Sequence, residues 1–340
     1  MVVNVKFTNG IRRGSFNING IKGTFPIQSI TSTNLNHADI FEDPNFNFKT
    51  NIVEIVEFKP KKLVSNSEYR EKRVKIISEM IEAHPDKLFL FTLKGARAAS
   101  YKTKTGIKVT PFKFTKTDNE SLIDFQIECG FTLIKAFFKR ARNAIENSRH
   151  YRSLIPEGKM FVASLDENMS HNAFRLLYSE CLKKGDDIIS FFGRKPSKSK
   201  KQIHNQLNFA FISRRTTDNI LRLTSFASKA IDGVVSSLIY NWYRFDSYSF
   251  MTRRGGQDIP DYEMKVLDGF HYIPLLQNTK LVCPITGKNL YESSKYFERT
   301  FDKSSLPVTI HDLVRLNEKF QVLHEEYTRE ELQEILGNRI

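Results

Sequence analysis

The feature that most constrains the fold of this chain is a repeated alternation of short apolar runs with charged, amphipathic runs. The apolar runs lie at 52–58, 88–93, 132–137, 160–165 and 187–192, and the helix-periodic runs lie at 69–83, 121–130, 139–148 and 171–184. Repeated strand–helix units of this length favour a parallel α/β fold over separate strand and helix domains. About seven or eight units would close a (β/α)8 TIM-like barrel, which we expect, and an open doubly wound sheet is the alternative.

Further segments complete the predicted architecture. Short strand-like bursts separated by glycines predict N-terminal strands joined by tight turns. The remaining expectations are N-terminal strands within 3–31, a hairpin arm at 105–114, a strand at 207–211, helices at 217–228 and 231–242, and a C-terminal helical extension at 291–340. We divide the chain into a barrel at 1–280 and a C-terminal segment at 281–340 that packs on it.

Composition points to an anionic partner. The chain has 340 residues, with 52 Lys and Arg against 38 Asp and Glu, and a net charge of +14. This excess favours nucleic acid ahead of a membrane surface, although charge that serves only solubility has the same composition. The three cysteines are widely spaced without a CxxC pair, and no apolar run approaches the length of a membrane span. We expect a soluble, cytoplasmic protein that is not bound to a membrane.

The candidate catalytic residue is Asp246, which lies among aromatic residues where a helical pattern gives way to a strand-like run. Arg253 and Arg254 follow closely. In a barrel, active sites gather at the carboxyl ends of the strands, and we expect Asp246 at that rim. A carboxylate placed there can attack a sugar carbon while the arginines bind a phosphate. The alternative is that Asp246 caps a turn and the arginines face water.

Four further residues are candidates for substrate binding. Gly193 and Arg194 open a basic run of nine residues, 193–201, on a loop that follows a predicted strand. A loop in that position can hold phosphates, or it can be a solvated loop. Asp166 and Lys94 also follow predicted strands. Proton transfer at the leaving base could come from Asp166 or Glu167, from His204 or from Lys94. The stronger alternatives are a helix cap for Asp166, a polar loop residue for His204 and a phosphate contact for Lys94.

Several of these stretches together resemble the tRNA-guanine transglycosylase superfamily, including its relatives that insert 7-deazaguanine bases into DNA. The stretches are Gly14-Ser15-Phe16 to Gly23-Thr24-Phe25-Pro26-Ile27, Phe245-Asp246-Ser247 with Arg253 and Gly255, Cys283-Pro284-Ile285-Thr286-Gly287, and His311-Asp312-Leu313. The resemblance implies a modified (β/α)8 barrel, an aspartate nucleophile at Asp246, and exchange of guanine for a deazapurine in DNA or tRNA. It also implies a homo- or hetero-oligomer.

The chain departs from that family at several motifs. The family's Asp-Ser-Gly signature is replaced by Thr92-Leu93-Lys94-Gly95-Ala96, and its second base-binding aspartate by Ala136-Phe137-Phe138-Lys139. The zinc segment keeps Cys283 and His311, which are too few ligands for a closed tetrahedral site. We therefore expect no metal and no cofactor, and either a rebuilt base pocket or a loss of activity.

Three functions remain open from the sequence. The first is a base-exchange transglycosylase that acts through Asp246, and it is the one we favour. The second is a catalytically degenerate barrel that binds DNA or RNA as a subunit. The third is a barrel that acts on a small phosphorylated metabolite, which would not need so broad a basic excess.

Overall fold

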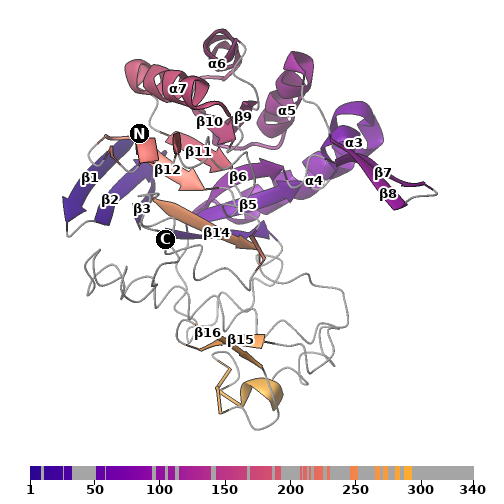
Figure 1. The fold of residues 1–340 in the computed structure, drawn as a ribbon, viewed down its shortest axis with the longest axis vertical. Coiled ribbons are helices and arrows are strands. Elements are labelled where there is room, and N and C mark those ends of the chain that lie inside the picture. Colours follow the sequence, from indigo (N-terminus) through magenta and orange to yellow (C-terminus); the bar gives the residue numbers. More distant parts are fainter. Residues whose placement is uncertain are drawn as a thin grey trace.

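The structure is a computed structural model that describes most of the first 224 residues and shorter parts of the rest. The described residues are 1–8, 11–25, 27–32, 51–57, 59–93, 97–103, 106–111, 115–138, 143–166, 169–185, 188–192, 207–208, 210–212, 214–215, 218–224, 228–229, 246–251, 265–268, 271–274, 280–283 and 287–292. The fold is mixed α/β with parallel sheets, as the alternation of strands and helices predicts (Figure 1).

The chain begins with an antiparallel sheet of three strands, β1 (Val2–Thr8), β2 (Ile11–Ile18) and β3 (Ile21–Phe25). The turn between β2 and β3 is Asn19-Gly20, and both residues have positive φ. This is the two-residue hairpin turn whose twist matches the twist of the strands. The prediction of short N-terminal strands joined by tight turns is confirmed.

Parallel strands form two further sheets whose order mostly follows the sequence. One sheet has the order β13-β14-β4-β5-β6 and the other β12-β11-β10-β9. Their bounds are β4 (Ile27–Thr31), β5 (Ile52–Glu57), β6 (Leu88–Leu93), β9 (Leu133–Phe138), β10 (Met160–Asp166), β11 (Ile188–Phe192), β12 (Leu221–Thr224), β13 (Ser228–Lys229) and β14 (Ser247–Met251). In addition, β6 lies beside β9 and β12 lies beside β14.

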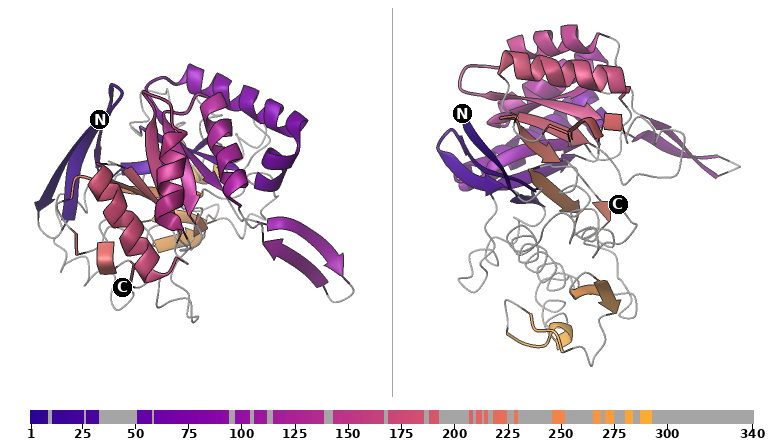
Figure 2. Two further views of the ribbon diagram at one scale, coloured as in Figure 1. Left: turned by 90° about the horizontal axis from the view of Figure 1, so that it is seen from above. Right: turned by 60° about the vertical axis from the view of Figure 1, so that its left-hand side comes forward.

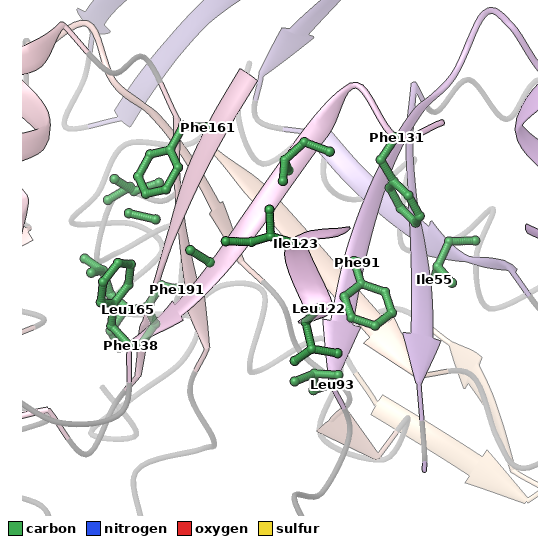
Figure 3. Close-up of a cluster of buried hydrophobic side chains, with 14 of the residues drawn as sticks. Ile55, Phe91, Leu93, Leu122, Ile123, Phe131, Phe138, Phe161, Leu165 and Phe191 are labelled. Atoms are coloured by element: carbon green, nitrogen blue, oxygen red, sulfur yellow. The ribbon is translucent and has the colours of Figure 1, made fainter. Parts of the chain in front are cut away.

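Helices cover the outer face of the parallel strands. They are α3 (Pro60–Ser65), α4 (Ser67–Ala83), α5 (Lys116–Glu128), α6 (Ala144–Ser153) and α7 (His171–Lys184). One side of β5, β6, β9, β10 and β11 packs against them in a large apolar core, part of which Figure 3 shows. Phe91 of β6, for example, contacts Phe125 of α5 with ring centroids 5.5 Å apart. Among the described helices, none has the length and hydropathy needed to cross a bilayer.

The opposite, inner side of the strands forms a second apolar core together with the N-terminal sheet. Phe16, Ile18 and Phe25 of the N-terminal sheet are buried there with residues from the first halves of the parallel strands. Those strand residues are Ile27, Ile52, Leu88, Leu90, Leu133, Val162, Ile188, Leu221 and Leu223. The N-terminal sheet therefore closes the amino ends of the parallel strands.

Amide side chains from α5 satisfy one edge of β9. Gln126 accepts a hydrogen bond from the backbone N–H of Lys135 at 2.8 Å and donates one to its carbonyl at 2.9 Å. Asn119 makes the same pair of bonds to the backbone of Phe137. Buried backbone groups need partners, and these bonds occupy β9 groups on the side that faces β6. The seam between β6 and β9 is thus closed in part by helix side chains.

A hairpin arm extends from the carboxyl end of β6. It consists of β7 (Arg97–Thr103) and β8 (Gly106–Pro111), which pair with each other in a sheet of their own, and it confirms the predicted hairpin. All three views place this arm and the N-terminal sheet on opposite sides of the molecule (Figures 1 and 2). A second small hairpin joins β15 (Lys265–Asp268) and β16 (His271–Pro274).

Four predicted elements differ from the structure. The described residues of 207–211 are helical, and the predicted helix at 217–228 contains strand β12 and the first residue of β13. Helix α5 begins earlier than expected because Thr115 and Asp118 form a capping box. Helix α6 begins at Ala144, whereas a helix was expected over 139–148. The predicted helices at 231–242 and in the C-terminal extension lie outside the described residues, apart from a short helical turn near 291.

We predict that Gln126→Met destabilises the fold, because it leaves the buried N–H and carbonyl of Lys135 without their amide partner. The expected loss of unfolding free energy is on the order of 3 kcal/mol. Urea denaturation measures it. Asp124→Ala is the matched control, since Asp124 is exposed on the same helix and its replacement should change stability by less than about 0.5 kcal/mol. A loss no larger than that of the control would contradict the role of α5 at the seam.

Candidate functional site

Asp246 lies at the amino end of the parallel strands. It directly precedes β14, and its backbone joins two neighbouring strands. Its N–H donates to the carbonyl of Arg222 on β12, and its carbonyl accepts from the N–H of Ile27 on β4, both at 2.9 Å. The prediction that Asp246 lies at the carboxyl rim is therefore wrong. The strand-like run begins after Asp246, so the residue lies at the start of a strand and not at its end.

The Asp246 carboxylate is completely buried and both of its oxygens have partners. Oδ1 accepts from Nε of Arg12 at 2.8 Å, and Oδ2 accepts from the backbone N–H of Arg222 at 2.8 Å. Burial raises the pKa of Asp246, while the positive charges of Arg12 and Arg222 act in the opposite direction. Among the described residues, Arg12 and Arg222 are the cations that act on Asp246. Its assignment as the catalytic residue stays a prediction.

This carboxylate belongs to a larger buried network, which we call the Arg12 network: Arg12, Tyr178, Asp218, Arg222 and Asp246. Arg12 also donates to the carbonyls of Asp218 and Ile220, and Arg222 donates to the Asp218 carboxylate at 2.9 Å. The hydroxyl of Tyr178 on α7 donates to the same carboxylate at 2.5 Å. Two arginines and two aspartates balance in charge, which suits a buried structural network.

A second group of buried polar residues lies on the inner side of the parallel strands, and we call it the polar layer. Each member follows a residue of the inner apolar core by two positions, so it lies on the same face and closer to the carboxyl end. The members are Ser29, Glu54, Thr92, Lys135, Ser164 and Ser190, each on a different strand from β4 to β11. Side chains at this end of parallel strands are positioned for function.

Lys135 is the member with the most perturbed chemistry. Its side chain is fully buried on β9. Burial lowers the pKa of the Lys135 amine to about 7, while the negative charge of Glu54 on β5 acts in the opposite direction. The Lys135 amine lies 5.9 Å from the ring centroid of Phe137, two residues further along β9, and that ring also contacts Phe91 of the outer core. A desolvated amine of this kind can act as a base or as a nucleophile at neutral pH.

The structure locates few of the other predicted site residues. Asp166 is the last residue of β10, opposite Phe192 of β11. Lys94, Glu167, Gly193, Arg194, His204, Arg253 and Arg254 lie outside the described residues. The polar layer was missed at the sequence level. A signal was present, since Lys135 is the one polar residue of β9 and Glu54 is one of two glutamates in β5, but both runs were interpreted only as strands.

The described part of the chain was also searched for groups of side chains that could bind a metal ion. Among the residues that the structure describes, no three His, Cys, Asp or Glu side chains are grouped so that they could hold a metal ion. Cys283 is fully buried among apolar residues, and His311 lies outside the described residues.

Comparisons with known proteins find only distant structural similarity. No protein-family model and no curated protein sequence matches the chain. A 3-dehydroquinate dehydratase from Geobacillus kaustophilus HTA426 is 10% identical with a TM-score of 0.42, over 71% of this chain and 89% of that one. A type I 3-dehydroquinate dehydratase from Clostridium difficile is 11% identical with a TM-score of 0.40, over 70% and 89%. Scores this low support no conclusion about activity.

We predict that Arg12→Met strongly destabilises the protein, because it leaves Asp246 buried without its charged partner. The expected cost is about 3–5 kcal/mol of unfolding free energy, measured by urea denaturation. Lys6→Met is the control, since Lys6 is an exposed cation on the neighbouring strand β1. Equal stabilities of the two variants would show that the Arg12 network contributes little.

We also predict a pH dependence from Lys135. Because the pKa of this amine is lowered to about 7 in the folded chain, the unfolded chain binds more protons between that value and the ordinary lysine pKa. Stability contributed at this site therefore rises with pH above about 7 and levels off near pH 10, with a slope of at most about 1.4 kcal/mol per pH unit. Relative to Lys135→Met, the unfolding free energy of wild type should rise with pH across this range by up to that slope. Parallel curves of unfolding free energy against pH for the two proteins would contradict the prediction.

Proposed function

We propose that this chain binds duplex nucleic acid, with a preference for DNA, at the carboxyl ends of its parallel strands. The observation that carries the proposal is the hairpin arm of β7 and β8, which extends from that end of β6 (Figures 1 and 2). The arm pairs with no other described strand. An isolated two-stranded hairpin is marginally stable in water, so a partner is expected to order it.

The sequence of the arm and its flanks has the charge that such a partner requires. Seven Lys and Arg residues lie between 94 and 116 with no Asp or Glu among them: Lys94, Arg97, Lys102, Lys104, Lys108, Lys113 and Lys116. Tyr101, Phe112 and Phe114 lie between these cations. Phosphate neutralisation by such residues supplies most of the affinity for nucleic acid. This local excess is stronger support than the net charge of the whole chain.

The shape of the arm supports DNA over duplex RNA. A two-stranded β-ribbon fits the wide major groove of B-form DNA. The major groove of A-form RNA is deep and narrow, and side chains do not read it. We therefore favour duplex DNA as the partner, with structured RNA as the alternative that the binding experiment tests.

We further propose that the two parallel sheets form one TIM-like barrel of eight positions. Strand β6 contacts β9, and β12 contacts β14, so the two sheets can be joined into one ring of strands. In that ring the short strands β12 and β13 together count as one of the eight strand positions. The ring would be incomplete in hydrogen bonding at the β6–β9 seam, where Asn119 and Gln126 bind the β9 backbone. In such a barrel, the polar layer and the root of the arm share the carboxyl end.

This placement bears on the reaction that the family resemblance implies. Base exchange through Asp246 requires that its carboxylate reach a sugar, but Asp246 is buried at the opposite end from the arm. We therefore favour the catalytically degenerate, nucleic-acid-binding form of the transglycosylase-like barrel. Base exchange with guanine or a deazapurine is the alternative, and it would require the Arg12–Asp246 pair to open.

The test is salt-dependent binding to a DNA duplex and to a tRNA by wild type and by a triple variant, Lys102→Gln, Lys104→Gln and Lys108→Gln. Removing one cation that neutralises a phosphate should reduce the slope of log K against log salt by about 0.9 on B-form DNA, so we expect a reduction of about 2–3. The matched control replaces Lys61, Lys72 and Lys75 by Gln, three exposed residues of α3 and α4 with the same total charge.

Equal slopes for the two triple variants would overturn the assignment of the arm, and tighter binding of tRNA than of DNA would overturn the preference for DNA. The same mixtures, supplied with labelled guanine or deazapurine, report on base exchange. Incorporation by wild type that is abolished in Asp246→Asn, with folding intact, would establish the enzyme in place of the binding module.

A further inference from the structure

The N-terminal sheet has one face in the apolar core and the opposite face toward solvent. Side chains alternate between the two faces of a strand, and residues paired across strands share a face. The pairing of β1 with β2 and of β2 with β3 therefore defines a face on the side away from the core, which we call the exposed face. Its described side chains are exposed or half-buried, and they are Val2, Asn4, Lys6, Arg13, Ser15, Asn17, Lys22 and Thr24.

The charged residues of the exposed face are all cations. Lys6, Arg13 and Lys22 lie on it, and no Asp or Glu precedes Asp39 in the chain. Helix α4 shows the contrast, because it carries four Glu and four Lys or Arg, the mixture of signs that suits solubility. With the residues that the structure describes, none of the three cations of the exposed face forms an ion pair. Solubility alone therefore does not account for this face.

The cations lie at the two ends of the exposed face. Lys6 of β1 is directly opposite Arg13 of β2, a position in which like charges destabilise a sheet. Lys22 of β3 is opposite Asn17 of β2, which is four residues from Arg13 and thus roughly 13 Å away along the strand. The row between these ends consists of short polar side chains, Asn4, Ser15 and Thr24. A bound anion at Lys6 and Arg13 would offset their repulsion.

We propose that the exposed face binds the phosphate backbone of duplex nucleic acid, as a second contact surface besides the arm. Lys and Arg neutralise phosphates, and Ser, Thr and Asn side chains donate hydrogen bonds to phosphate oxygens. An anionic membrane suits the face less well, because Val2 is the one apolar residue among its described side chains. Binding to a membrane surface depends on a larger apolar area.

The exposed face and the arm are directed toward opposite ends of the molecule. The N-terminal sheet covers the amino ends of the parallel strands, whereas the arm begins at the carboxyl end of β6 (Figures 1 and 2). A straight duplex that lies on one surface therefore does not reach the other, and one molecule bridges two duplex segments. Bridging rests on the proposed function of the arm, whereas binding at the exposed face does not.

Binding at the exposed face is tested apart from the arm. The substitutions Lys6→Gln, Arg13→Gln and Lys22→Gln are added to the triple arm variant described above. We expect the slope of log K against log salt for a DNA duplex to fall by a further 2–3 or so, because each phosphate contact contributes about 0.9. The control adds the three Gln substitutions of α3 and α4 to the same arm variant. Equal slopes for the two combined variants would overturn the proposal, whatever the arm contributes.

Bridging is tested by capture of a second duplex. A short DNA duplex is immobilised, the full chain is bound to it, and retention of a second, labelled duplex is measured. Wild type should retain the second duplex. A variant with only Lys6→Gln, Arg13→Gln and Lys22→Gln should bind the first duplex and retain at least about tenfold less of the second. Equal retention by this variant and wild type would overturn bridging through the exposed face.

Two further outcomes separate the surfaces and the partners. A triple arm variant that binds a single duplex as wild type does would overturn the role of the arm and leave the result for the exposed face standing. Binding of wild type to phosphatidylserine vesicles that is tighter than to the duplex, and that is lost when the three cations of the exposed face are replaced, would overturn nucleic acid as the partner of that face.

Discussion

The buried ion pair between Arg12 and Asp246 connects two parts of this fold that lie 234 residues apart in the sequence. Arg12 belongs to the N-terminal sheet, and Asp246 directly precedes the last strand of a parallel sheet. The backbone of Asp246 bonds to both β4 and β12, so one residue fixes a strand from each parallel sheet and the sheet that covers their amino ends. Removing either partner leaves a charge with no water to solvate it.

This arrangement divides the inner side of the parallel strands into two parts. At the amino end, the apolar core and the Arg12 network seal the strands against the N-terminal sheet. Toward the carboxyl end, six strands each contribute one buried polar side chain, and the basic arm begins at the same end. The end that is sealed provides rigidity, and both ends are proposed to contact nucleic acid, through the exposed face of the N-terminal sheet and through the arm.

The sequence predicted the parallel α/β class because the apolar runs of buried strands are unambiguous, as at 88–93 and 160–165. The sequence-based prediction placed Asp246 at the wrong end of a strand. Asp246 lies between a helical pattern and a strand-like pattern, and the local sequence only weakly determines the residue at which an element begins or ends. A polar residue within an apolar strand marks Lys135 in the sequence, but its interaction with Glu54 joins two separate strands and becomes visible only when the fold is known.

A double-mutant cycle on Arg12 and Asp246 tests the central claim most directly, that this pair is a closed structural contact and not an open catalytic carboxylate. Unfolding free energies of wild type, Arg12→Met, Asp246→Asn and the double variant give the coupling between the two side chains. We predict a coupling of at least about 2 kcal/mol, since residues in one buried ion pair are strongly interdependent. Costs that add to within about 0.5 kcal/mol would contradict it.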